Sequence, residues 1–184
     1  AEIFGNLNIC LGESTTLSAP DADSWLWSTG ATTKTITVSP TANTDYTLTI
    51  KSGDCTATIT ETVVVNALPV PTLTSSANAN TVCVGNSTVL TAGTGYKYYK
   101  WSTGQEGTNM RSISVSPTAK TTYTVEVTDA SGCKGVNQIT IDVTQIASPT
   151  ISVLSGSTTV CAGEEVILQS RASNQYQWST NGGL

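Results

Sequence analysis

The feature that most constrains this chain is an internal repeat that begins three times. The stretches CLGESTTLSA, CVGNSTVLTA and CAGEEVILQS start at Cys10, Cys83 and Cys161, so successive units are offset by 73 and 78 residues. Self-similarity at a nearly fixed spacing indicates that one structural unit has been copied along the chain. The fold of a single unit therefore decides the architecture of the whole sequence.

Each unit carries a tryptophan at nearly the same distance from its first cysteine. The sequence WST begins at Trp27, Trp101 and Trp178, which lie 17, 18 and 17 residues after that cysteine. A glycine completes the motif in the first two units, whereas asparagine stands there in the third. A motif that recurs in every copy is expected to belong to the repeated fold rather than to one chemical site.

Two units are complete and the third is not. The segment VSPTANTDYTLTI at Val38 matches VSPTAKTTYTVEV at Val115, and each is followed by a second cysteine, Cys55 or Cys133. The third unit stops at Leu184 without these features, so we expect the chain to be a fragment of a longer polypeptide. The proline-containing joins NALPVPT and QIASPT mark the boundaries, which gives domains at residues 1–66, 67–145 and 146–184.

Apolar and polar residues alternate within a unit. Ile36 and Val38 alternate with threonine, and Ile113 and Val115 alternate with serine. A period of two is typical of strands that bury one face. Turn signals such as STG, SPT and SG separate about seven short strands in some 75 residues, the spacing of an immunoglobulin-like sandwich. We therefore predict an all-β chain of tandem immunoglobulin-like β-sandwich domains, the third of which is truncated.

The repeated tryptophan is expected to be the centre of each sandwich core. In immunoglobulin domains a tryptophan on strand C packs between the two sheets, and a tyrosine opens strand F. At the places of the usual disulfide between the sheets this chain has apolar residues, so the sheets are expected to be joined by apolar packing. The predicted core residues are Trp27, Trp101, Trp178, Tyr46, Tyr123, Leu17 and Leu90.

A second aromatic residue stands two positions before each of these tryptophans, at Trp25, Tyr99 and Tyr176. Residues two apart on a strand share a face. We expect these side chains to close the core near the loop that precedes strand C. The alternative is an exposed platform on which a sugar ring stacks.

The five cysteines are widely spaced, and the chain has no CxxC pair and no histidine. This pattern favours disulfides over zinc and indicates an oxidising compartment. The strand map places the two cysteines of one unit at opposite ends of a sandwich. A strand of seven residues covers about 23 Å, whereas a disulfide requires Cα atoms within roughly 7 Å.

We therefore favour a disulfide between Cys10 and Cys133, across the joint of neighbouring domains. Cys55, Cys83 and Cys161 are then expected to pair with neighbouring repeats outside this sequence. Pairs within each domain, Cys10 with Cys55 and Cys83 with Cys133, are the alternative if the strand ends differ from this map.

Composition excludes several classes of function. The net charge is -5 and only 11% of the residues are charged, so there is no basic footprint for nucleic acid. No run is long and apolar enough to span a bilayer, and residues 1–20 lack the pattern of a signal peptide. The absence of histidine removes Ser-His-Asp and Cys-His catalysis. We expect no enzyme and no cofactor; Asp21 and Asp23 in PDADS form a weak candidate for a calcium site.

The motifs CxGxSxxLxA, YxWSTG and SITVSPTxxTTYTVxVTDxxGC resemble the Ig-like repeats of large surface proteins from gliding, type IX secreting Bacteroidota, including SprB-like motility adhesins. The resemblance runs over residues 10–55, 83–133 and 161–180. It implies an extracellular, cell-surface location and a mechanical or adhesive role. The WSTN of the third unit departs from the pattern, and no C-terminal sorting domain follows.

Together these points predict a noncatalytic stalk segment of a large adhesin or filament, active in adhesion or gliding motility. Its expected partners are neighbouring repeats of the same polypeptide, surface polysaccharide or other adhesin chains. One alternative is a carbohydrate-binding Ig-like module that uses the loops PDADS and SGD. Another is a noncatalytic spacer of a secreted hydrolase.

Overall fold

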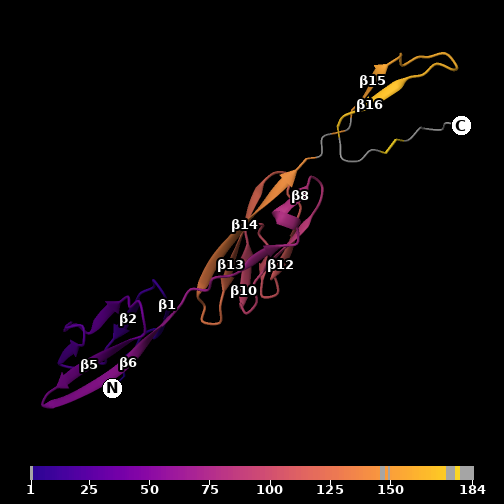
Figure 1. Ribbon diagram of the computed structural model, residues 1–184. Helices are drawn as coiled ribbons and strands as arrows, with labels where there is room; N and C mark the ends of the chain where they lie inside the picture. The colour runs from indigo at the N-terminus through magenta and orange to yellow at the C-terminus, as the bar shows by residue number, and fades with distance from the viewer. Residues whose placement is uncertain (1, 146–147, 149, 173–176, 179–184) are drawn as a thin grey trace. The chain divides into compact units, whose positions relative to one another are not determined.

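The computed structural model describes residues 2–145, 148, 150–172 and 177–178 (Figure 1). The chain divides into two compact units, Ala1–Thr144 and Gln145–Leu184. The first unit contains both complete repeats, which we call domain 1 (residues 1–66) and domain 2 (residues 67–144). In the part of the chain that the structure describes, the only helical segment is a 3-10 turn, Asn78–Asn80. The all-β fold predicted from the alternating pattern is confirmed.

The described part of domain 1 is a sandwich of two sheets. One sheet has the strand order β1-β6-β5-β3 and the other pairs β2 with β4. A bridge between Phe4 and Ser18 adds the first residues of the chain to the second sheet. The strands are β1 (Asn8–Cys10), β2 (Thr15–Ser18), β3 (Ser24–Trp27), β4 (Thr35–Val38), β5 (Thr44–Ser52) and β6 (Cys55–Asn66).

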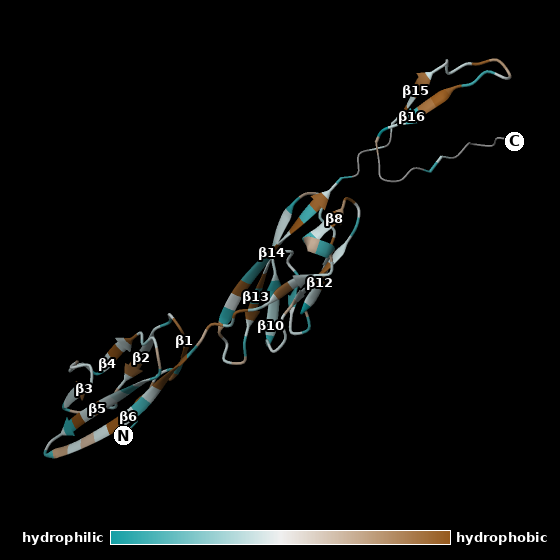
Figure 2. Ribbon diagram, viewed as in Figure 1, coloured by the Kyte–Doolittle hydropathy of each residue, from teal (hydrophilic) through white to brown (hydrophobic). Residues whose placement is uncertain are grey.

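Domain 2 repeats this architecture with two additional strands. Its sheets have the orders β11-β10-β13-β14-β8 and β12-β9-β7. Hydrophilic and apolar residues alternate along β14, as Figure 2 shows, because one face of that strand lies on the core. The strands are β7 (Leu73–Ser75), β8 (Thr81–Cys83), β9 (Thr88–Ala92), β10 (Tyr98–Trp101), β11 (Glu106–Gly107), β12 (Ser112–Val115), β13 (Thr121–Thr128) and β14 (Lys134–Thr144). This two-layer arrangement is immunoglobulin-like.

The repeated tryptophan lies at the centre of the core in both complete domains. Trp27 and Trp101 are each only 2% exposed, and each indole N–H donates a hydrogen bond to a backbone carbonyl, that of Thr33 or Met110. Each domain has its own cluster of buried residues around its tryptophan. The buried residues also include the other expected core residues of domains 1 and 2, namely Leu17, Leu90, Tyr46 and Tyr123.

The residues after the tryptophan form a turn, so the WSTG motif is structural in both complete domains. The N–H of Gly30 donates to the Trp27 carbonyl at 2.8 Å, and Gly30 has a φ of +85°, which favours glycine. The Ser28 hydroxyl oxygen accepts the Thr47 N–H at 3.2 Å and ties the turn to β5. Domain 2 has the same contacts at equivalent positions.

The aromatic residue two positions earlier closes the core rather than forming a platform. Trp25 is half-buried against the core of domain 1, and its indole N–H donates to the Pro20 carbonyl at 3.0 Å. Tyr99 is 3% exposed, and its hydroxyl donates to the Gly93 carbonyl at 3.1 Å. Tyr176 lies outside the described residues.

The sequence pattern does not predict one short strand in each domain, the strand that ends at Cys10 or Cys83. Each cysteine ends a three-residue strand, β1 or β8, that pairs in parallel with the last strand of its domain, β6 or β14. Three residues are too few to show an alternating pattern, so hydropathy gives no signal for them.

The described residues of the third unit form one strand pair, β15 (Ile151–Ser155) with β16 (Ile167–Ser170). Ile151 pairs with Ser170, which is the register that Leu73 and Ala92 have in domain 2. Leu168 is nevertheless 47% exposed, whereas the equivalent Leu90 is 0% exposed.

The prediction that Trp178 is a core residue is wrong for this chain. Trp178 is 52% exposed. In domain 2 the equivalent Trp101 lies on β10, and it is covered because its sheet packs on the sheet that contains β9 and β7. The described strand pair of the third unit, β15 with β16, corresponds to β7 with β9, and among the described residues of this unit no second sheet carries the tryptophan. The residue pattern recurs in this unit, but the two-sheet packing that buries tryptophan does not recur among its described residues.

Replacing Trp27 with alanine is expected to destabilise domain 1 by about 3–5 kcal/mol, because it removes a buried indole and leaves a cavity. Thermal unfolding followed by hydrogen exchange at Leu48 measures the loss. Leu26→Ala is the matched control, because Leu26 lies on the same strand and is 53% exposed. Equal destabilisation by the two variants would contradict the central role of Trp27 in the core of domain 1.

Candidate functional site at the joint of domains 1 and 2

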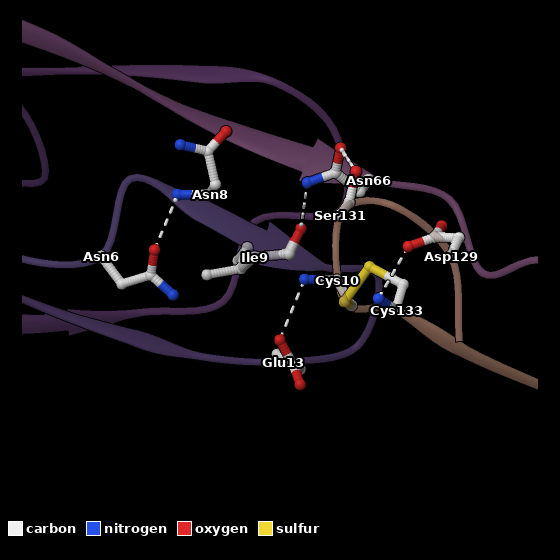
Figure 3. Close-up of a disulfide and its surroundings, with 9 residues drawn as sticks. All are labelled: Asn6, Asn8, Ile9, Cys10, Glu13, Asn66, Asp129, Ser131 and Cys133. Carbon is white, nitrogen blue, oxygen red and sulfur yellow. Dashed lines mark hydrogen bonds between the residues drawn. A yellow bond between two sulfur atoms is a disulfide. The ribbon is translucent and has the colours of Figure 1, made fainter. Parts of the chain in front are cut away.

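A disulfide joins the two complete domains. Cys10 of domain 1 and Cys133 of domain 2 are bonded (Figure 3), with Cα atoms 5.6 Å apart and a sequence separation of 123 residues. This is the pairing across the joint that the strand map favoured. The alternative pairs within each domain, Cys10 with Cys55 and Cys83 with Cys133, are wrong, because two of these cysteines are already joined to each other and Cys55 and Cys83 are free.

Strand pairing positions Cys10 at the end of domain 1. Because β1 runs parallel to β6, Cys10 lies opposite Asn66, the last residue of β6. The Leu11 N–H donates to the Asn66 carbonyl at 2.8 Å, and the Asn66 amide donates to the Ile9 carbonyl at 3.2 Å. Ile9, 2% exposed, anchors the strand in the core. We call this arrangement of β1, β6 and the following turn the acceptor end of domain 1.

A glycine turn follows Cys10 and fixes its backbone. The Glu13 N–H donates to the Cys10 carbonyl at 2.9 Å, and the Cys10 N–H donates to the Glu13 carboxylate at 3.0 Å (Figure 3). Gly12 has a φ of +92°, a conformation that residues with a side chain rarely adopt. The CxGx sequence is therefore the local signal for a cysteine presented at a domain end.

Domain 2 supplies the second cysteine from the loop between β13 and β14, which we call the donor loop (residues 129–133). The Cys133 N–H donates to the Asp129 carboxylate at 2.9 Å, and the Asp129 N–H donates to the Cys133 carbonyl at 2.9 Å. Cys133 is 0% exposed. The Ser131 hydroxyl donates to the side-chain oxygen of Asn66 at 3.3 Å, so the donor loop also contacts the last residue of domain 1 (Figure 3).

The linker between the domains is seated on β14. The Asn137 side-chain amide donates to the Pro71 carbonyl at 2.7 Å. A Cβ atom at Gly135 would lie 1.7 Å from the Pro69 carbonyl oxygen, so only glycine leaves room for the linker at that position. Pro71 is fully buried. The prolines mark the linker in the sequence, whereas no sequence pattern indicates the two residues that hold it, Gly135 and Asn137.

The disulfide closes a long loop of chain. For a loop of this length, the chain-entropy model assigns a stabilisation of about 4–5 kcal/mol, because the bond restricts the unfolded state. The hydrogen bonds of the joint each contribute about 1 kcal/mol. The joint is therefore dominated by one covalent bond, and its chemistry is thiol oxidation and reduction.

The other three cysteines are free in this chain. Cys55 and Cys161 are exposed and Cys83 is half-buried. Their expected pairing with neighbouring repeats stays a prediction, since it requires residues outside this sequence.

The candidate calcium ligands have protein partners. The Asp21 carboxylate forms an ion pair with Lys34, whose hydrogen bond and charge lower the pKa of Asp21. The Asp23 carboxylate accepts the Gly53 N–H at 2.7 Å and joins the PDADS loop to the SGD turn. The two carboxylates thus bond to different partners, and across the described ranges no group of three or more His, Cys, Asp or Glu side chains is arranged to hold a metal.

Among the residues that the structure describes, no helix has the length and apolarity needed to cross a membrane. The described surface instead carries threonine pairs bonded across strands, such as Thr47 with Thr60 at 2.9 Å and Thr122 with Thr140 at 2.8 Å. These uncharged pairs stabilise neighbouring strands.

No family model and no curated protein matches the chain significantly. Solved structures that resemble it include three N-terminal domains of the highly immunogenic outer capsid protein Hoc of bacteriophage RB49. The sequence identity to that structure is 18% and the TM-score is 0.41. The match covers 92% of this chain and 68% of that chain. Murine CEACAM1b has 13% identity, coverages of 78% and 100%, and a TM-score of 0.37. The amphioxus IgVJ-C2 molecule has 12% identity, coverages of 73% and 99%, and a TM-score of 0.31.

Gly135→Ala is expected to displace the linker or β14, because the added methyl group meets the Pro69 carbonyl. Overpacking of this kind costs about 1–3 kcal/mol. Hydrogen exchange at residues 67–72 and the unfolding midpoint of domain 2 measure the effect. Val136→Ala on the same strand is the control, since Val136 is 59% exposed. An unchanged exchange pattern in Gly135→Ala would show that the linker is not seated there.

Proposed function

We propose that this chain is a tension-bearing segment of a large extracellular surface protein, built from immunoglobulin-like modules that are fastened to one another by disulfides. The observation that carries the proposal is the bond between Cys10 and Cys133, which joins two modules that each have their own core. Neither of the two apolar clusters contains Cys10 or Cys133. The effect of the bond is on the joint.

The bond changes how the chain transmits force. When the two ends of the chain are pulled, tension passes from Cys10 directly to Cys133, so the 123 residues of the loop do not extend with the rest. Without the bond the same residues, once unfolded and extended, would add about 400 Å to the length of the chain, at ~3.3 Å per residue. A segment with this property holds a near-constant length under load, which suits a stalk and brings no benefit to a catalyst.

Two further observations support an extracellular place of work. Disulfides persist in oxidising surroundings and are rare in the cytosol. The sequence is also poor in charge, with 11% charged residues, and its strand faces carry paired threonines. The resemblance to repeats of Bacteroidota surface proteins leads us to place the parent protein in adhesion or gliding motility, as part of an adhesin or filament.

The two alternatives receive less support. A sugar-binding role for the aromatic residues needs an exposed ring, whereas Trp25 is half-buried and its indole N–H is bonded to Pro20. A spacer in a secreted hydrolase would use the same joint, and only the flanking sequence of the parent protein separates that role from an adhesin stalk.

Single-molecule pulling on the two ends of the chain tests the mechanical claim. The oxidised protein is expected to reach a final contour length about 400 Å shorter than that of Cys10→Ser, because the bond excludes the loop from the tension path. Cys55→Ser is the control, since that cysteine is free, and it should behave like the unmodified chain. Equal contour lengths for the oxidised chain and Cys10→Ser would refute the proposal.

The biological claim needs a measurement on cells that carry the parent protein. Cys10→Ser together with Cys133→Ser is expected to weaken attachment or gliding under flow, while the amount of protein at the surface stays the same. Cys55→Ser again serves as the control. Attachment and gliding that do not change under flow would mean that the segment does not act in adhesion or motility, even if the pulling result stands.

A further inference from the structure

We propose that Cys83 has the same role in a second inter-domain disulfide that Cys10 has in the first. It forms this bond with a cysteine in the donor loop of the immunoglobulin-like module that follows domain 2. The inference goes beyond the proposed function, because it holds whether the parent protein is an adhesin or a secreted enzyme. It rests on a comparison of the two ends of this chain's own domains.

The strand pairing at Cys83 repeats that at Cys10. In domain 2 the parallel register places Cys83 opposite Thr144, the last residue of β14, as Cys10 lies opposite Asn66 in domain 1. The Val84 N–H donates to the Thr144 carbonyl at 3.0 Å, which matches the bond from the residue after Cys10.

Side chains brace the two ends in the same way. The Thr144 hydroxyl donates to the Val82 carbonyl at 3.3 Å, at the place where the Asn66 amide donates to the carbonyl of Ile9. Val82 is 6% exposed and anchors its strand in the core, as Ile9 does in domain 1. Domain 2 thus has an acceptor end of the same construction.

The turn after Cys83 is also the same. The Asn86 N–H donates to the Cys83 carbonyl at 3.0 Å, and Gly85 has a φ of +88°. One difference is that Asn86 stands where Glu13 accepts the cysteine N–H in domain 1. The backbone that presents the thiol is nevertheless preformed, and the thiol itself is half-buried and free.

The required partner is a cysteine in a donor loop, preceded by a glycine as in Gly132–Cys133. Neither remaining cysteine of this chain fits. Cys161 lies in an acceptor turn of its own, in which the Glu164 N–H donates to the Cys161 carbonyl at 3.1 Å. Cys55 begins β6 directly after a two-residue hairpin turn, and its domain precedes domain 2. The order seen in the first joint, acceptor in one module and donor in the next, assigns Cys83 to the module that follows.

The bond forms by thiol–disulfide exchange. With a low-molecular-weight disulfide as oxidant, two protein thiols lose two protons and two electrons, and the oxidant is reduced to two thiols. The first joint needs the same chemistry, so no additional reagent is involved in the second.

The test inserts a second copy of residues 67–144 after Thr144 of the full chain, so that domain 2 is followed by a complete module. After oxidation with glutathione disulfide, peptide mapping without reduction is expected to recover Cys83 of the first copy bonded to Cys133 of the inserted copy. The number of free thiols should remain three, as in the original chain. The insertion adds two cysteines, and the new disulfide uses two thiols. The bond between Cys10 and Cys133 is the internal reference for correct oxidation.

Two variants of the extended chain make the result decisive. Cys83→Ser in the first copy should leave the inserted Cys133 as a free thiol, whereas Cys161→Ser should leave the new bond in place. Five free thiols in the extended chain, or a bond from the inserted Cys133 to any residue other than Cys83, would overturn the proposal. If the inserted copy did not fold, its Trp101 would be exposed to solvent. An inserted copy that folds but does not form the bond counts against the inference. The result is independent of the adhesion measurement, so either proposal can fail alone.

Discussion

The parallel pairing of β1 with β6 is the interaction on which the joint depends. Because the two strands run in the same direction, β1 ends where β6 delivers the chain to the linker, and Cys10 therefore lies at the end of domain 1 that adjoins domain 2. The anchor is small: three paired residues, one buried side chain at Ile9 and a glycine turn. An antiparallel strand in this place would present the cysteine at the opposite end of the sandwich, far from the donor loop.

Stability and connection are separate in this molecule. Each complete domain is held by its own apolar cluster around Trp27 or Trp101. The joint is made by one covalent bond, the contact between Ser131 and Asn66, and the packing of the linker on β14. Neither apolar cluster contains Cys10 or Cys133, so oxidation and reduction act on the joint rather than on either cluster.

Much of the fold was predictable because the repeat supplied the same pattern twice. The alternation at residues such as Ile36 and Ile113, together with the spacing of the tryptophans, was enough for the sandwich and for the cores of the two complete domains. The inter-domain disulfide was favoured by the expected strand ends, but pairs within each domain stayed open until the structure joined Cys10 to Cys133. The three-residue strands that end at Cys10 and Cys83 were not predictable, because their position depends on pairing with a strand more than fifty residues away. Trp178 shows the converse, since a local pattern cannot report whether the other strands that bury the tryptophan between two sheets are present.

The disulfide also changes what a single break in the backbone can do. Residues 10 to 133 form a covalent ring that contains most of both complete domains, with β14 outside it. Cleavage of one peptide bond inside that ring, at any exposed loop from the PDADS segment to the end of β13, leaves the N-terminal and C-terminal flanks in the same molecule. A chain built in this way would survive a first cut by a protease without losing what lies beyond the cut.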